Sequence, residues 1–300
     1  MWFRYFSYRK LYNLQVKKPK NIFVSTTFAK DDSRISDVLK ICKKEKVFNI
    51  ELGSNHIYEN NFKRIINKYN FKFIIHNYFP IPKKSFVVNI ASLNKKIRDL
   101  SLQHIKKAII FCKETNSKLY TFHPGFLYDP ISASRSKENY DFIWRNKNLK
   151  KNRNLAYKQM LLSLKKIVNF AKKKQIKIAI ETEGSFRKKN LCLMQTPEEY
   201  KKLFYYFSPS DLGISLNIGH LNLASRAFNF SRKKFVDGIK NYIVALELSH
   251  NNRLDDQHLP LKKNAWYWKI INDLSFAKAY KILEFRNTGI KRIKKVINFF

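Results

Sequence analysis

The chain contains short runs of apolar residues at regular intervals, separated by segments in which apolar residues follow helical spacing. Apolar runs of about four to eight residues are typical of strands buried on both faces. Strands are therefore predicted at 21–25, 47–52, 71–75, 118–122, 176–180, 212–216, 242–246 and 280–283. Helices are predicted after them, at 35–45, 60–69, 93–114, 152–174, from Thr196 onward, 232–240, 264–274 and 290–300.

This alternation of strand and helix predicts the fold class. Strand–helix units repeated over roughly 250 residues favour an α/β fold made of a single (β/α)8 TIM barrel, with the active site at the carboxyl ends of the strands. An open, doubly wound sheet is the alternative. Segment 24–28, after the first strand, contains no glycine, so a nucleotide-phosphate fingerprint is not supported there. The barrel is predicted to span 21–300.

Two segments lie outside this repeating pattern. Residues 1–20 are rich in aromatic and basic side chains and are interpreted as an N-terminal extension. We expect the extension to cover the bottom of the barrel or to contact a second subunit of a homo-oligomer, with a membrane surface as the alternative. The loop at 128–148 leaves the fourth predicted strand at the active face, and we expect it to be a substrate lid.

Composition limits the possible partners. Lys and Arg number 60 against 22 Asp and Glu, a formal net charge of +38, which attracts nucleic acid, an anionic membrane or a phosphorylated substrate. Because the lysines are spread over the predicted helices, a compositional origin is favoured, and nucleic acid stays open as a partner. No apolar run reaches the ~18 residues that a transmembrane helix needs. Three scattered cysteines favour a reducing, cytoplasmic compartment over a disulfide framework.

Most of the predicted strands end in a residue that can bind a metal ion. Carboxyl ends of barrel strands meet at one rim, so these side chains are expected to converge. A single strand-end histidine is most often a hydrogen-bonded core residue, but the joint pattern favours a site for Mn, Zn, Co or Mg. His104, inside the helix at 93–114, is interpreted as a surface residue. The metal-capable residues are His76, His123, Glu181, His220, Glu247 or His250, Asp256, His258 and Glu284.

Several short motifs carry a family resemblance. They are Ile75-His-Asn-Tyr, Val88-Asn-Ile-Ala-Ser92, Thr121-Phe-His-Pro-Gly125, Glu181-Thr-Glu-Gly184, Asn217-Ile-Gly-His220, Asp256-Gln-His258 and Ile282-Leu-Glu284. In this order, over about residues 21–290, the chain resembles the xylose isomerase-like TIM-barrel superfamily. That superfamily includes sugar (phosphate) isomerases and epimerases and the endonuclease IV apurinic-site nucleases.

The chain departs from the family pattern at two positions. Asn217 stands where the family usually has Asp, and an amide binds a divalent cation more weakly than a carboxylate does. Glu247 stands where the family's seventh-strand motif usually begins with His. Glu247 is therefore the preferred ligand at that strand, and His250 then belongs to the loop. A gained Glu would offset the charge of the lost Asp.

The resemblance to isomerases and epimerases implies one divalent ion among Glu181, Asn217, Glu247 and Glu284. Glu181 and Glu284 would be the catalytic pair, moving a proton to and from a small sugar or sugar phosphate. Four further predicted ligands would complete the metal shell or hold substrate hydroxyls: His220, His250, Asp256 and His258. Four other residues would bind the rest of the substrate: His76, His123, Arg253 and Arg286.

The resemblance to the nucleases implies a different activity, cleavage of abasic DNA. His76 and His123 would then recruit further metals beside Glu181 to activate water and clamp a phosphodiester. The net charge favours this alternative, whereas Asn217, Glu247 and the short gap before Asp256 favour the sugar enzymes. A barrel with an impaired metal site is the third possibility, since Asn217 weakens one ligand position.

Overall fold

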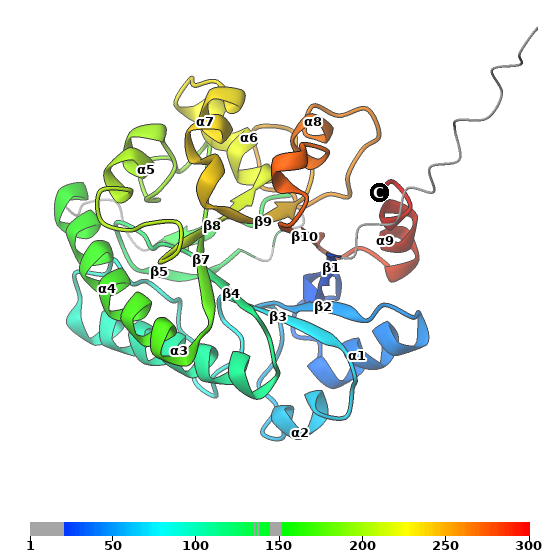
Figure 1. Cartoon of the computed structure of the whole chain (residues 1–300). Helices are drawn as coiled ribbons and strands as arrows, with labels where there is room; N and C mark the ends of the chain where they lie inside the picture. Colours follow the sequence, from blue (N-terminus) through cyan, green and yellow to red (C-terminus); the bar gives the residue numbers. More distant parts are fainter. Residues whose placement is uncertain (1–20, 135, 137, 145–151) are drawn as a thin grey trace, which may run out of the picture.

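The computed structural model describes residues 21–134, 136, 138–144 and 152–300, so the predicted extension at 1–20 lies outside the described residues. Eight parallel strands form a closed barrel in the order β1-β10-β9-β8-β7-β4-β3-β2, and β1 pairs with both β2 and β10. This confirms the predicted (β/α)8 barrel over the open sheet (Figure 1). The strands are β1 Ile22–Ser25, β2 Asn49–Leu52, β3 Lys72–His76, β4 Leu119–Phe122, β7 Lys177–Glu181, β8 Gly213–Asn217, β9 Ile243–Leu248 and β10 Tyr280–Leu283.

Helices surround the strands, and α3 and α4 run side by side along one flank (Figure 1). None of the described helices is long and apolar enough to cross a membrane. The α-helices are α1 Ile35–Lys44, α2 Phe62–Ile66, α3 Lys95–Glu114, α4 Arg153–Lys174, α5 Pro197–Leu203, α6 Ile218–Ala227, α7 Arg232–Ile239, α8 Trp268–Ile271 and α9 Ile290–Ile297. Short 3-10 turns occur at η1 Thr26–Phe28, η2 Lys240–Tyr242 and η3 Leu274–Phe276.

Three segments differ from the predicted elements. Helix α6 begins directly after β8, where no helix was predicted, because the Asn217 side chain caps it by accepting a hydrogen bond from the backbone N–H of His220 at 3.1 Å. The helix predicted at 264–274 is reduced to α8 and η3, because Trp268 Nε1 donates to the Lys262 carbonyl and holds the preceding turn. The predicted irregular loop contains a two-stranded antiparallel hairpin, β5 Pro130–Ala133 and β6 Phe142–Trp144.

Side chains inside the barrel form two layers. The lower layer is apolar and fully buried, and it consists of Phe23, Ile74, Leu119, Ala179, Ala245 and Ile282. Alternate residues of a strand point to the same side, so the residues two positions further along also face the interior. These are polar and buried: Ser25, His76, Thr121, Glu181, Glu247 and Glu284, together with Glu51 and Ser215 from the two remaining strands. The strand pattern thus creates a polar chamber on an apolar floor.

The prediction that His104 lies on the surface is wrong. Its side chain is only 5% exposed, on the inner side of α3, where the rings of Tyr78 and Phe86 lie at centroid distances of 5.4 and 5.8 Å. Burial lowers the pKa of this imidazole to about 4. Helical spacing alone did not predict this burial, because the loop that carries Tyr78 and Phe86 covers that part of the helix.

We expect His104 to make the protein less stable in mild acid. The unfolded chain takes up a proton near the ordinary histidine pKa, whereas the folded chain resists it until about pH 4, so stability is lost as pH falls between these values. Relative to wild type, His104→Gln should lose less unfolding free energy between about pH 7.5 and about pH 4.5, by roughly 2 to 3 kcal/mol. Urea denaturation at both pH values measures this, and identical acid sensitivity would contradict it.

Candidate metal centre

A cavity of about 90 Å³ opens at the carboxyl ends of the strands. It is lined by ionisable side chains from six barrel strands or the loops that follow them. Two larger cavities, of about 720 and 380 Å³, lie elsewhere, beside α1 and between α2 and α3, and share none of these residues. The ionisable lining consists of His76, His123, Asp141, Glu181, Glu183, His220, Asp256, His258, Glu284 and Arg286, with Tyr140 and Cys192.

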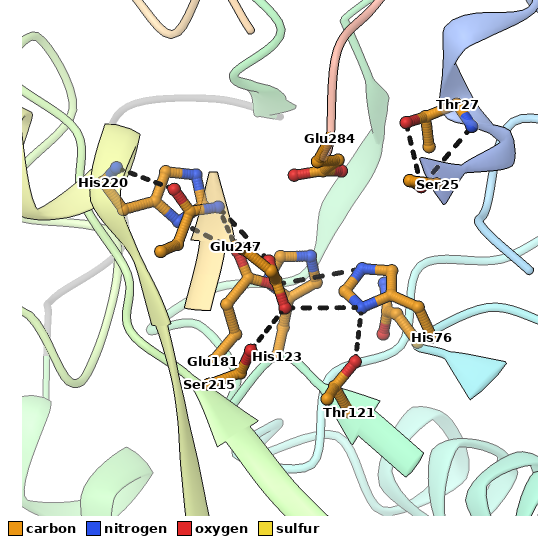
Figure 2. A network of polar contacts seen from close by, with 12 residues as sticks. Ser25, Thr27, His76, Thr121, His123, Glu181, Ser215, His220, Glu247 and Glu284 are labelled. Carbon is orange, nitrogen blue, oxygen red and sulfur yellow. Dashed lines mark hydrogen bonds and ion pairs between the residues drawn. The ribbon is translucent and has the colours of Figure 1, made fainter. Parts of the chain in front are cut away.

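Glu181 occupies the centre of the first half of this site (Figure 2). Its Oε1 accepts a hydrogen bond from Asn217 Nδ2 at 2.8 Å and lies 3.1 Å from His220 Nδ1. Its Oε2 lies 3.5 Å from His123 Nδ1 and 3.8 Å from His76 Nε2. Among the described residues, this buried Oε2 has no hydrogen-bond partner. Glu181 therefore keeps one carboxylate oxygen free, facing two imidazoles.

Asp256 occupies the centre of the second half. Its Oδ2 lies 2.9 Å from His258 Nε2 and 3.4 Å from His220 Nε2, and its Oδ1 is buried without a hydrogen bond within the described part of the chain. His220 Nδ1 lies 2.8 Å from the Thr182 carbonyl oxygen, which can only accept, so Nδ1 carries a proton and donates to it. The other ring nitrogen, Nε2, faces Asp256. Glu284 joins through His258 Nδ1, 3.2 Å from its Oε2.

The histidines near the carboxylates have displaced pKa values. Burial opposes a charge on His258, but Asp256 and Glu284 raise its pKa to about 10. Burial opposes a charge on His123 as well, and Glu181 with Glu183 raises its pKa to about 9. Without a metal ion, these two imidazoles are therefore cations at neutral pH, and they neutralise the carboxylates beside them.

The pKa values of Glu181 and Asp256 are displaced in the opposite direction. Burial alone would raise the pKa of Glu181, but the charge of His123 and contacts with His220 hold it well below its usual range. The pKa of Asp256 is also held well below its usual range, against burial, by His258 and His220. Both carboxylates are therefore ionised and can serve as metal ligands or proton acceptors.

Glycines permit two close approaches that bring the site together. A side chain on Gly184 would place its Cβ 2.0 Å from the His220 carbonyl oxygen, so only glycine lets the loop after β7 pack against the start of α6. Gly125 has φ +111° and leaves only 2.7 Å for a Cβ beside Asn89 Oδ1, which accepts from the Phe126 N–H at 2.9 Å. The motifs around Asn89 and His123 thus lock together.

The donor set fits a divalent cation. Two groups of three residues line the cavity, His76–His123–Glu181 and His220–Asp256–His258, and within each group the ligand atoms lie within 4.8 Å of one another. Imidazole nitrogen with carboxylate oxygen suits Zn, Mn or Co. The buried carboxylate oxygens of Glu181 and Asp256, which have no hydrogen bond among the described residues, are the atoms that such an ion would satisfy.

The predicted site residues fall into three sets. Those that line the cavity are His76, His123, Glu181, His220, Asp256, His258, Glu284 and Arg286. Asn217 and Glu247 contact each other beneath it, with Asn217 Nδ2 3.3 Å from Glu247 Oε2. Neither His250 nor Arg253 lines this cavity. The backbone of His250 pairs with Leu259 and its ring lies 6.1 Å from that of Tyr267, and Arg253 is exposed at a position with φ 67°.

Sequence reasoning missed other lining residues. Glu183 lies 2.7 Å from His123 Nδ1, and its place two residues after Glu181 in the same motif was an available signal. Tyr140 and Phe142 lie in the loop at 128–148 that was expected at the active face, but nothing in the sequence distinguished these two residues from the rest of that loop.

Residues of the hairpin region, Ala133, Tyr140, Asp141 and Phe142, line the cavity. The Tyr140 backbone N–H donates to the Asp256 carbonyl at 2.8 Å, and Asn287 Nδ2 donates to the Tyr140 hydroxyl at 2.7 Å. On the other side, Lys188 Nζ donates to the Phe142 carbonyl at 2.8 Å. These hydrogen bonds join the hairpin region to the loops that follow β7, β9 and β10. Within the predicted lid region, residues 135, 137 and 145–148, which include Arg135, Lys137 and Arg145, lie outside the described residues.

These features define the class of protein: a (β/α)8 barrel with a histidine- and carboxylate-lined pocket at the carboxyl ends of its strands. More particularly, the chain belongs to the xylose isomerase-like TIM barrel family, whose model matches residues 43–300. The family resemblance expected from the sequence motifs is thereby confirmed.

Two relatives come from Methanocaldococcus jannaschii. "Uncharacterized protein MJ1311" is 26% identical over 217 residues, which cover 70% of this chain and only 62% of that protein. "Uncharacterized protein MJ1614" is 24% identical over 272 residues, covering 89% of this chain and 92% of that protein.

Solved structures share the fold. A D-tagatose 3-epimerase-like protein superposes with a TM-score of 0.66 at 21% identity, covering 93% of this chain and 97% of the other. An AP endonuclease, family 2, from Brucella melitensis superposes with a TM-score of 0.62 at 8% identity, covering 89% and 93%. At these identities the likeness concerns the fold alone.

Proposed function

We propose that this protein is a divalent-metal-dependent isomerase or epimerase of a small sugar or sugar phosphate. One observation carries the proposal: Glu181 and Glu284 enter the same small cavity of about 90 Å³, which residues of the hairpin region also line. A cavity of this size, walled by carboxylates and imidazoles, suits a short polyhydroxylated substrate. The similarity in fold to a D-tagatose 3-epimerase-like protein supports this choice.

The ion would be held by donors that line the cavity, Glu181, His220, Asp256, His258 and Glu284. When bound, it would supply Lewis-acid polarisation of the substrate's carbonyl and hydroxyl oxygens. Mn, Zn, Co and Mg all remain candidates.

Glu181 and Glu284 would transfer the proton. One carboxylate takes the proton from the carbon beside the carbonyl, and the electron pair of the broken C–H bond shifts onto the carbonyl oxygen. The other group, which starts the cycle as the protonated acid, returns its proton to that carbon, on the opposite face in an epimerase, and the electron pair on the carbonyl oxygen moves back to form the new C–H bond. Histidine contacts outweigh burial and lower the pKa of each carboxyl, so each group is ionised and able to act as the base. The group that acts as the acid would first take up a proton from solvent.

The opposite wall would hold the rest of the substrate. Arg286 lies 3.8 Å from Asp31 and 4.9 Å from the centre of the Tyr140 ring, and its buried Nε has no hydrogen-bond partner in the part of the chain that is described. Ser54 Oγ and Asn77 Oδ1, in the same lining, are likewise unsatisfied among the described residues. A substrate phosphate or hydroxyl groups would satisfy these atoms.

Deuterium exchange tests the proposal. The metal-loaded protein, incubated in D₂O with a panel of ketoses and their phosphates, should place deuterium on the carbon beside the carbonyl, as NMR detects. Prior treatment with EDTA should abolish the exchange, and Mn²⁺ should restore it. Absence of exchange across the panel with the metal-loaded protein would contradict the proposal.

A second candidate function is cleavage of abasic DNA. The observation that favours it is the presence of two separate three-residue ligand groups in the cavity, His76–His123–Glu181 and His220–Asp256–His258, as clustered metals in hydrolases require. The net charge of +38 adds attraction to phosphate. Nicking of a duplex with one abasic site, lost with EDTA and absent on intact duplex, would favour this function over the isomerase.

A further inference from the structure

We propose that Glu51, His76 and Glu247 form a further divalent-cation site above the apolar floor of the barrel, beneath the substrate cavity, and that it shares His76 with the His76–His123–Glu181 group. Glu51 belongs to β2 and was not among the predicted ligands. Ligand atoms of the three residues lie within 4.8 Å of one another. The proposal goes beyond the isomerase activity and does not depend on it.

The site follows from the barrel's layers. Glu51 and Glu247 face the interior directly above the apolar floor, and β2, β9 and β3 hold the three side chains rigidly. Neither carboxylate belongs to the lining of the substrate cavity, whereas His76 does. His76 therefore forms the boundary between the chamber below and the cavity above.

Burial is the main argument. Glu51 and Glu247 are each only 1% exposed, so each carboxyl must find its polar partners inside the chamber. Buried Glu51 Oε2 has no hydrogen-bond partner among the described residues. His76 Nδ1 lies 4.0 Å from Glu247 Oε1. A cation held by all three residues would satisfy the free oxygen of Glu51.

The neighbouring polar atoms suit a cation that prefers nitrogen and oxygen ligands. Ser215 Oγ donates to Glu247 Oε1 at 2.7 Å, and Thr121 Oγ1 lies 2.8 Å from His76 Nδ1. Figure 2 shows these residues grouped below Glu284. One imidazole, two carboxylates and adjacent hydroxyls form a donor set for Zn²⁺ or Mn²⁺. Asn217 strengthens the case, because its amide directs a hydrogen of Nδ2 toward Glu247 and holds that carboxylate in place.

Counting bound ions tests the site. Equilibrium dialysis of the full chain against Mn²⁺ or Zn²⁺, followed by elemental analysis, should find one ion fewer per chain in Glu51→Gln than in wild type. Gln keeps the size of Glu and removes its charge. Glu59→Gln is the matched control, since this loop residue accepts hydrogen bonds from Ser36 outside the chamber and its ion count should equal that of wild type. An unchanged count and affinity in Glu51→Gln would overturn the proposal.

Wild-type crystals provide an independent measurement should Glu51→Gln fail to fold. Anomalous diffraction after a Mn²⁺ soak should show a peak between Glu51, His76 and Glu247. Peaks confined to the cavity above, or a chamber without any, would overturn the site. The two proposals fail separately: loss of deuterium exchange with the floor ion present would reject only the isomerase, and exchange without a floor ion would reject only this site.

Discussion

Glu181→Gln is expected to lower the rate of deuterium exchange into the substrate by about 10² to 10⁴-fold, the usual contribution of a general acid or base. The amide keeps the shape of the side chain, and its oxygen can still accept the hydrogen bond that Asn217 donates at 2.8 Å. It cannot take up a proton in the working pH range, however, and it binds a cation more weakly. Exchange measured by NMR at saturating Mn²⁺ gives the rate.

Glu284→Gln should produce a loss of the same order, because each carboxylate serves one face of the reacting carbon. Glu114→Gln is the control: this residue is on the outer surface of α3, where it pairs with Lys63, and its rate should match wild type. Thermal melts establish that each variant is folded. Wild-type exchange in both Glu181→Gln and Glu284→Gln would remove the pair from the mechanism.

Asn217→Asp is expected to have the second large effect, and its sign should depend on metal. The Asn217 amide donates toward two buried carboxylates, at 2.8 Å to Glu181 and 3.3 Å to Glu247, which a carboxylate cannot do. In EDTA, the substitution should therefore lower the free energy of unfolding by roughly 2 to 4 kcal/mol. With Mn²⁺ present, the added carboxylate becomes a ligand, and the deficit should shrink or reverse.

Urea denaturation in EDTA and in Mn²⁺ measures both halves of this expectation. Asn222→Asp is the matched control. Asn222 is also buried in α6, but its Oδ1 accepts from Arg232 at 2.7 Å, so a carboxylate there gains a cationic partner and its stability should not depend on metal. Equal stability of Asn217→Asp and wild type in EDTA would show that the amide does not bridge the two carboxylates.

Asn217 also changes how the departures from the family pattern are understood. From the sequence, replacement of the usual Asp weakened one ligand, and Glu247 offset the lost charge. In the structure Asn217 caps α6 through Oδ1 and restrains Glu181 and Glu247 through Nδ2. Its amide is thus engaged in positioning three neighbours, and Glu247 lies beneath the cavity with Glu51. Whether Asn217 or Glu247 contacts an ion stays a prediction that the experiments above decide.

The sequence by itself determined the barrel and the rim. Apolar runs of strand length alternate with helical spacing, and parallel strands closed into a ring bring their carboxyl ends together, so His76, Glu181 and Glu284 had to meet. The motifs and their order along the chain also predicted the family whose model matches residues 43–300.

Only the tertiary structure decided which side chains face which neighbours. His250 follows β9 and is three residues after Glu247, yet its backbone pairs with Leu259 and its side chain does not line the cavity. Glu51 lies near the end of an ordinary buried strand, and its significance appears only because Glu51 and Glu247, far apart in sequence, meet inside the barrel. The burial of His104 and the place of Tyr140 at the cavity arise in the same way: local periodicity specifies an element and its faces, whereas contacts between distant segments depend on how the whole ring packs.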